Sequence, residues 1–258
     1  MTTPTIAARG AGAGTMTLGY LRLELRRLLR DRAYLLGSML MPTVMYLLFT
    51  NLGGLSGQNR AGAALYSMIG LAAFGAIGAV LNNGGQIVEE RTSGWLRQLR
   101  TTPMPPLRVV AVRAATAMVV ALPCIGVICL AGTIINGVRL DAGQWVQVLL
   151  QLWLGVIPFA LLGLAIGHAA TARTLPLFNM LAYLAMSVIG GLWMPIWVFP
   201  GWLQAIGKLL PTHAYQDMSW RIVAGEPPSV GNLAVLAAWL VIFGALAAMA
   251  YRRAGRTR

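Results

Sequence analysis

Apolar residues fill most of this chain in long runs, and short stretches between the runs hold most of the charged side chains. Six runs are long enough to cross a bilayer, because about 20 helical residues span its hydrocarbon core of about 30 Å. Proline interrupts several runs, as at Pro42, Pro123 and Pro158, which spanning helices tolerate better than soluble ones. The pattern predicts an all-α membrane protein with spans at residues 33–52, 61–88, 109–135, 145–167, 174–198 and 231–251.

Just before the first apolar run, residues 18–32 place leucine and arginine on separate helical faces. This separation favours an amphipathic helix in the headgroup layer, with its arginines toward anionic lipid. A simple polar extension of the first span is the alternative interpretation. Residues 1–17, rich in glycine, alanine and threonine, predict a disordered tail. The arginines of the amphipathic helix are Arg22, Arg26, Arg27 and Arg30.

The connection between the fifth and sixth runs is neither a polar loop nor a span. Within it, Pro200 and Pro211 bracket an apolar piece of about 15 Å, which is half the thickness of a membrane. Tryptophans such as Trp202 and Trp220 are typical of places where one end of the ring is wet and the other apolar. We expect residues 199–228 to form a re-entrant segment of two short helices that dip into the membrane and return.

The composition points to the same class of protein. Hydrophobic residues make up 57% of the 258 residues and charged residues 10%, with a mean hydropathy of +0.69. A soluble domain carries about 25% charged residues, and a chain of this length has too little interior to hide so much apolar surface from water. Lipid is therefore the expected solvent for most of this chain.

The net charge of +13 arises from arginines at the edges of the apolar runs. Because they form no single basic face, we expect no binding of nucleic acid. With both termini on one side of the membrane, that side holds sixteen of the 20 basic residues and the other side four. Basic loops stay in the cytoplasm, so both termini, including a basic tail at 252–258, are expected on the cytoplasmic side of the cytoplasmic membrane.

Familiar catalytic motifs are missing from the sequence. The single lysine, Lys208, precedes Leu209, so no G-x-x-x-x-G-K-[ST] phosphate loop is present. His168 and His213 stand isolated at the ends of apolar segments, and no serine lies in a G-x-S-x-G context. We expect a chain that is not an enzyme, with no catalytic residue, no metal site and no cofactor of its own.

The apolar runs also lack charged side chains at mid-membrane. Ion-coupled carriers usually keep an ionisable group there, so energy for uphill movement would have to enter from outside the membrane. Gly163 and Gly167 form a G-x-x-x-G pair that could bring two helices close together. Polar residues within the runs that could line a substrate path are Asn82, Asn83, Asn179 and Tyr183.

Residues 89–108 form a compact charged segment between the second and third spans. Two glutamates end the second span, and a short helix at residues 95–100 would carry a tryptophan and two leucines on one edge. Three prolines then stop the helix and turn the chain. An ordinary charged loop would explain the arginines but not the apolar edge or the proline stop, so a docking element is the favoured interpretation.

An acid followed by Gly94, by Leu96 and Leu99, and by Thr102-Pro103 resembles the cytoplasmic loop of ATP-binding-cassette (ABC) type-2 exporter permeases. The arginine-rich helix before the first span is similar to the elbow helix of that family. Residues 190–228 are similar to its closing segment, with a glycine-rich span end and two short apolar pieces between prolines. Arginine and glutamine directly precede Leu99, where the family often has an acid.

The resemblance implies the membrane subunit of an exporter, working as a homodimer or heterodimer with cytoplasmic ATP-binding subunits that would hold ATP and magnesium. The cargo would be hydrophobic or amphipathic, such as a drug, an antibiotic or a lipid, which suits the uncharged spans. A non-transporting assembly or sensor subunit that recruits a soluble partner is the alternative. The residues that would contact the ATPase are Glu89, Glu90, Gly94, Trp95, Leu96, Leu99, Thr102 and Pro103.

Overall fold

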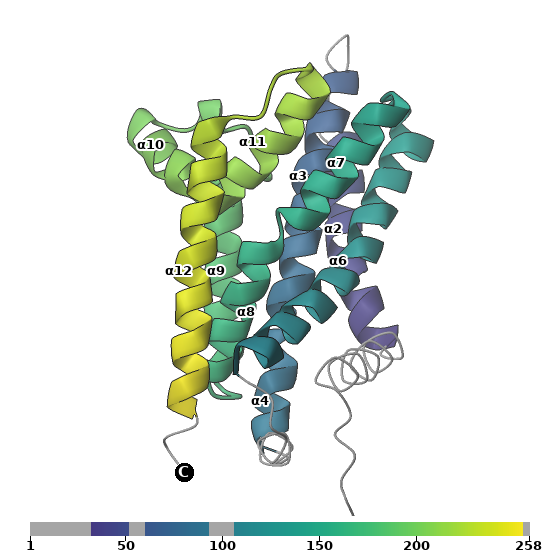
Figure 1. Cartoon of the computed structure of the whole chain (residues 1–258). Coiled ribbons are helices and arrows are strands. Elements are labelled where there is room, and N and C mark those ends of the chain that lie inside the picture. The colour runs from purple at the N-terminus through teal and green to yellow at the C-terminus, as the bar shows by residue number, and fades with distance from the viewer. Residues whose placement is uncertain (1–31, 52–59, 93–105, 255–258) are drawn as a thin grey trace, which may run out of the picture.

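The computed structural model of the chain describes residues 32–51, 60–92 and 106–254. All elements in these ranges are helices, as predicted, and most of them run along one common axis (Figure 1). In chain order they are α2 (Arg32–Asn51), α3 (Arg60–Asn82), α4 (Gly84–Thr92), α6 (Pro106–Asn136), α7 (Ala142–Leu154), α8 (Ile157–Ala169), α9 (Leu175–Ile189), the 3-10 helix η1 (Ile196–Val198), α10 (Gly201–Leu209), α11 (Pro211–Ala224) and α12 (Val230–Ala254).

The two ends of the helix bundle differ in charge. The lower end in Figure 1 holds the end of α4, the start of α6, the turn from α8 to α9, and the end of α12. Exposed arginines lie there at positions 173, 252 and 253, together with one exposed acidic residue, Glu89. The upper end holds α10 and α11 and carries both signs of charge, with Arg221 in a salt bridge of 3.0 Å to Glu226.

Among the described residues, four stretches of helix are long and apolar enough to cross a membrane: Ala61–Glu89, Val110–Asn136, Ala142–Ala169 and Val230–Arg253. Several such stretches in one chain indicate a multi-pass membrane protein. The four stretches differ in how much of them is buried within the chain. In the most apolar part of α3–α4, 83% of the residues are buried, compared with only 11% in α12. Helix α3 is therefore the centre of the bundle, and α12 lies at its edge.

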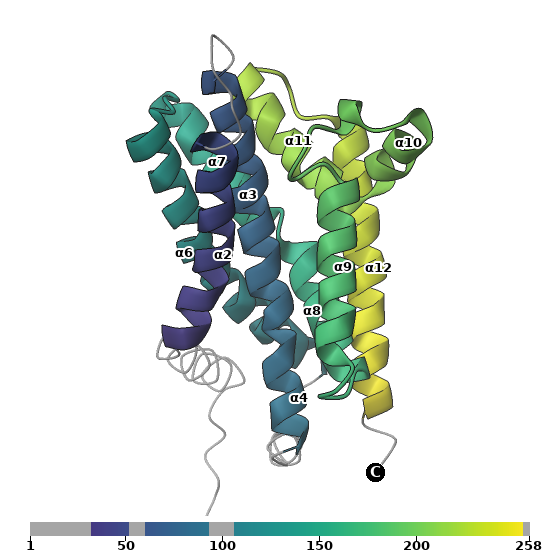
Figure 2. The same ribbon diagram turned by 180° about the vertical axis from the view of Figure 1, so that it is seen from behind.

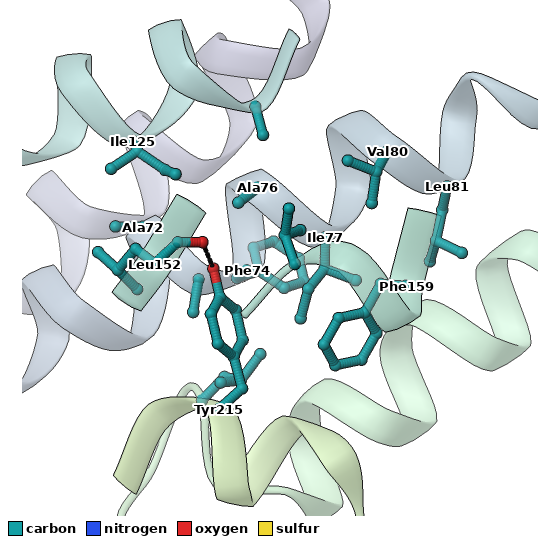
Figure 3. Packing of buried hydrophobic residues seen from close by; sticks show 14 of the residues in the cluster. Ala72, Phe74, Ala76, Ile77, Val80, Leu81, Ile125, Leu152, Phe159 and Tyr215 are labelled. Atoms are coloured by element: carbon teal, nitrogen blue, oxygen red, sulfur yellow. Dashed lines mark hydrogen bonds between the residues drawn. The ribbon is translucent and has the colours of Figure 1, made fainter. Parts of the chain in front are cut away.

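The hydrophobic core is built around α3. Phe74, Ile77 and Leu81 of this helix belong to one buried cluster with Ile125 of α6 and Phe159 of α8 (Figure 3). These side chains are almost fully excluded from solvent. The core thus fixes α3 between α6 on one side and α8 on the other.

The predicted fourth span, 145–167, is interrupted near its middle. Helix α7 ends at Leu154 and α8 begins at Ile157, followed directly by Pro158, which lacks a backbone N–H and favours a helix start. The gap is filled by Tyr215 of α11, whose hydroxyl donates a hydrogen bond to the carbonyl of Leu152 (Figure 3). A Cβ at Gly155 would lie 2.4 Å from the tyrosine ring, so glycine makes room for it.

Small residues bring α8 against the junction of α3 and α4. A Cβ at Gly84 would lie 2.4 Å from the carbonyl oxygen of Gly163, and one at Gly167 would lie 2.5 Å from that of Gly84. The two backbones therefore touch directly, which only glycine permits. The prediction that Gly163 and Gly167 mediate a helix contact is confirmed, and the contact lies within one chain.

The predicted fifth span, 174–198, is wrong in length. Helix α9 ends at Ile189, and the chain turns at Gly191, whose φ of +88° favours glycine. Its 15 residues extend about 22 Å, less than the bilayer core. After η1, helices α10 and α11 follow as two short helices at the upper end (Figure 2). That this pair re-enters the bilayer stays a prediction.

Candidate functional site

A groove of about 400 Å³ runs between α3–α4 and α9, in the half of the bundle nearer the lower end. Figure 2 shows these helices neighbouring each other there. We call it the α3–α9 groove. Its lining is mostly apolar, with three polar side chains. The lining residues are Gly78, Leu81, Asn82 and Gly85 from α3–α4, and Leu175, Pro176, Asn179, Met180, Tyr183 and Leu184 from α9.

Three of the four predicted path residues meet in this groove. Asn82, Asn179 and Tyr183 all line it, although about a hundred positions separate the first from the other two. Asn83 is buried at the junction of α3 and α4 and is not part of the lining. The structure thus brings three polar groups onto one apolar surface, and their contact with a cargo stays a prediction.

Asn179 is the most buried polar side chain of the α3–α9 groove, with 8% of its surface exposed. Its Nδ2 donates to the carbonyl of Leu81 at 3.3 Å, in the last turn of α3, where carbonyls lack partners within the helix. Its Oδ1 is also buried and has no hydrogen-bond partner among the described residues. A buried acceptor without a partner is unfavourable, so this atom is suited to a donor group on a ligand or water.

Tyr183 closes the upper part of the groove. Its hydroxyl donates to the carbonyl of Phe74 at 2.9 Å, and its ring stacks on that of Phe74 at 4.2 Å with an angle of 11° between the planes. Gly78 leaves space for the hydroxyl, because a Cβ there would lie 2.7 Å from it. The ring of Trp193 meets Phe74 edge-on at 5.3 Å. Above Tyr183 the two helices are therefore joined by aromatic packing.

The upper end is held by further hydrogen bonds from side chains to backbone carbonyls. The Tyr66 hydroxyl of α3 donates to the carbonyl of Gly191 at 2.6 Å, just past the end of α9. Thr212 of α11 donates from Oγ1 to the carbonyl of Met186 at 2.6 Å, in the last turn of α9. The Tyr66 ring also meets Trp220 of α11 edge-on at 5.7 Å. These contacts join α3, α9 and α11 across the top of the bundle.

The residues predicted to dock the ATPase fall mostly outside the described residues. Glu89 is exposed on α4 at the lower end, and Glu90 follows in the same helix. The other predicted docking residues, from Gly94 to Pro103, and the elbow arginines at positions 22, 26, 27 and 30 lie outside the described ranges. The end of α4 and the start of α6, which flank this segment, both lie in the lower part of the bundle (Figure 1).

Sequence reasoning did not find two tyrosines, Tyr66 and Tyr215, that join helices distant in the sequence. Tyr66 and Tyr215 act on carbonyls 125 and 63 positions away, so no local pattern reveals them. The only sequence feature that could have indicated these contacts is a glycine close to each tyrosine: Gly155 lies beside Tyr215, and Gly191 lies beside Tyr66. Glycine within or just after an apolar run marks a place where another group approaches the backbone closely.

The sequence profile of the family described as "ABC-2 type transporter" matches residues 18–221. The chain is also 29% identical over 221 residues to a Bacillus subtilis (strain 168) protein named "Putative transport permease YvfS". That alignment covers 85% of this chain and 90% of the relative. Both similarities include the α3–α9 groove and the segment between α4 and α6.

Proposed function

Because this chain belongs to the ABC-2 type transporter family, and is therefore a membrane permease, we propose that it moves a hydrophobic or amphipathic compound out of the cell. Permeases of this family work with ATP-binding subunits in general. We infer that here two separate cytoplasmic ATPase subunits supply the energy and hold the ATP and magnesium. Drugs, antibiotics and lipids are the classes of cargo that fit.

The observation that carries this proposal is the α3–α9 groove. Its volume of about 400 Å³ lies within the range of small-molecule sites, and its lining is apolar with a few polar groups. The groove has no charged residue in its lining, which favours an uncharged or amphipathic cargo. Asn179 Oδ1 and the exposed Asn82 would contact polar groups of that cargo.

The position of the groove supports a direction of transport. It lies toward the lower, arginine-rich end, while aromatic packing and hydrogen bonds close the upper end above Tyr183. Basic ends of membrane proteins face the cytoplasm, so this arrangement would admit cargo from the cytoplasmic side and hold the outer side shut. Both termini would then be cytoplasmic, in the cytoplasmic membrane.

Energy would enter through the lower end. Residues 89–108 would form the coupling loop that contacts the ATPase, and residues 18–32 the interfacial elbow helix. Helix α4 continues α3 after the junction at Asn83, so a push on the loop at Glu89 would reach Gly85 in the groove after about one turn of helix and Asn82 after about two. A second permease chain, identical or different, would complete the transport path.

We further infer six crossings, formed by α2, α3–α4, α6, α7–α8, α9 and α12. Helices α10 and α11 would then be the re-entrant segment on the outer side. Their contacts support this arrangement, since Tyr215 of α11 reaches a carbonyl at the interruption of α7–α8. A non-helical backbone at membrane depth requires burial in protein, and Tyr215 is fully buried there.

Coupling is tested with the permease and its ATPase purified together and placed in vesicles. Trp95→Ala combined with Leu99→Ala should abolish both co-purification of the ATPase and ATP-driven efflux of a hydrophobic dye. Helical content by circular dichroism should stay as in the wild type, as a role in docking alone predicts. Unchanged efflux from the double variant would contradict the docking role. A wild-type chain that binds a soluble partner but transports nothing would favour the assembly or sensor alternative.

A further inference from the structure

A second and larger groove lies between α8, α9 and α12 at the lower end of the bundle. Its volume is about 610 Å³, and apolar side chains such as Ile166, Phe178 and Met249 form most of its wall. Phe178 is 52% exposed and Met249 47%, so the groove is open to the surroundings of the bundle. We call it the α8–α12 groove. It shares no lining residue with the α3–α9 groove.

The groove is apolar along its length and cationic at its lower rim. On α12 its lining consists of Leu246, Met249, Ala250 and Arg253, which share one helix face because they are three and four residues apart. From Leu246 to Arg253 the helix rises about 10 Å. The guanidinium group of Arg253 therefore lies at the lower end of an apolar channel, which extends about two turns of helix upward along α12.

The charge at the rim is not neutralised within the described part of the chain. Arg253 is exposed and forms no salt bridge with a described residue, and the lining includes no acidic residue. Arg252 and Arg173 are exposed at the same end of the bundle. A guanidinium group binds phosphate through paired hydrogen bonds, so this rim is suited to a phosphate ester.

One wall of the groove is fixed by His168, which is 4% exposed. Its Nδ1 lies 2.8 Å from the carbonyl of Leu164, and because a carbonyl can only accept, Nδ1 carries the proton of this hydrogen bond. Tyr251 of α12 meets the imidazole edge-on at 5.3 Å. The ring is thus held by both α8 and α12, which keeps the two helices in register where the groove opens.

We propose that the α8–α12 groove binds an anionic phospholipid, with its phosphate on Arg253 and an acyl chain against Leu246 and Met249. Basic pockets between membrane helices on the arginine-rich side are suited to anionic headgroups, and only an amphiphile matches both the charge and the apolar channel. A second copy of this chain, packed through the same face, would instead bring arginine-rich ends together. The proposal requires a membrane protein, and it does not depend on the exporter role.

Native mass spectrometry of the purified full chain tests this proposal, with phosphatidylglycerol or phosphatidylcholine added at known concentrations. The wild type should bind one phosphatidylglycerol more tightly than phosphatidylcholine. Arg253→Ala should weaken phosphatidylglycerol binding about fivefold, as expected for one arginine near a membrane surface. Arg252→Ala is the matched control, because it removes the same charge from the neighbouring residue, which does not line the groove, and should leave binding unchanged. Ala250→Trp, which fills the groove, should reduce binding without removing any charge.

Several results would overturn the proposal. Equal binding of phosphatidylglycerol and phosphatidylcholine would show that the charge at the rim does not favour an anionic headgroup. Equal weakening by Arg252→Ala and Arg253→Ala would indicate general attraction to a basic surface. Displacement of the lipid by inorganic phosphate alone would mean that the apolar channel does not contribute. A shift from dimer to monomer in Ala250→Trp, with lipid binding intact, would assign the groove to a second chain. Folding of each variant is checked by circular dichroism, and transport activity is not needed for any readout.

Discussion

The two halves of the bundle are built differently. In the upper half, hydrogen bonds from side chains to backbone carbonyls join helices that are far apart in sequence, from Tyr66 to Gly191 and from Tyr215 to Leu152. In the lower half, α3 and α9 separate to form a groove, and Asn179 donates one hydrogen bond across it. In the orientation that we propose, the upper half would keep the path closed on the outer side and the lower half would receive the cargo.

The comparison also separates two ways of holding helices together. Hydroxyls of Tyr215 and Thr212 donate to carbonyls in the last turns of α7 and α9, and the carbonyl of Met186 also accepts from the backbone N–H of Gly190. In the lower half, Gly84, Gly163 and Gly167 let two backbones touch without any side chain between them. Hydrogen bonds at helix ends can be broken and remade as elements move, whereas a glycine contact depends on close packing alone.

The largest expected effect comes from removing the ring of Tyr215. Tyr215→Ala leaves a cavity at the interruption of α7–α8 and a carbonyl without its donor, and it should lower the free energy of unfolding by about 3–5 kcal/mol. Tyr215→Phe keeps the ring and loses only the hydrogen bond, so a loss of about 1 kcal/mol is expected. Unfolding in mixed micelles with increasing dodecyl sulfate measures both values. Equal stability of the two variants would contradict the role assigned to the ring.

A smaller effect is expected at the glycine contact of the lower half. Gly167→Ala places a Cβ 2.5 Å from the carbonyl oxygen of Gly84, so α8 must move away from α3–α4. We expect a loss of about 1–3 kcal/mol in the free energy of unfolding, which is typical of overpacking. Gly126→Ala on α6 is the matched control, because a Cβ there has nothing within 4 Å. The same micelle titration applies, and similar behaviour of both variants would refute the close contact.

The smallest expected effect is a pH dependence at the upper end. Burial lowers the pKa of His213 on α11 below its ordinary value of 6.5; Lys208 acts in the same direction, and Asp217 and a backbone contact with Gly190 oppose it. The folded state then binds fewer protons than the unfolded state. The stability that this neutral histidine provides is present above the unfolded pKa and is lost as pH falls through the folded pKa.

The wild type should therefore lose more stability than His213→Gln between about pH 7 and pH 5. Melting temperatures in detergent at each pH provide the comparison. Because other titrating groups are common to both proteins, the difference between the two curves isolates His213. Parallel curves would mean that His213 titrates alike in the folded and unfolded states.

Much of the fold follows from the sequence because hydropathy is a local property. The apolar runs locate most helices to within a few residues, although α6 begins at Pro106, which the sequence predicts to belong to the loop. Of the polar residues predicted to line a substrate path, Asn82, Asn179 and Tyr183 lie together in the α3–α9 groove. The sequence also predicts Asn83, the neighbour of Asn82, as a residue of the substrate path, but Asn83 does not line the groove. The junction of α3 and α4 lies between them, and only the fold reveals which of the two faces α9.

The errors of sequence reasoning arise where distant residues decide the backbone. Hydropathy continues past Ile189, so the apolar run is longer than α9; the helix ends at Gly190 and Gly191, and the turn at Gly191 is stabilised by Tyr66 from another helix. The interruption at Gly155 likewise depends on Tyr215, which lies in a segment with few signs of helix packing in its sequence. Hydrophobic runs predict where helices can form, and long-range hydrogen bonds decide where they stop.

The most direct test of the central claim fills the α3–α9 groove and follows transport. Gly85 lines this groove, and a Cβ there would make only ordinary contact, 3.6 Å from Leu175, so Gly85→Leu should fold and occupy the space meant for cargo. Gly126→Leu, which adds the same side chain to open space on α6, is the control. With the ATPase still bound, we expect ATP-driven dye efflux to fall to background in Gly85→Leu and to stay at the wild-type rate in Gly126→Leu. Efflux at the wild-type rate from Gly85→Leu would contradict the assignment of the groove as the cargo site.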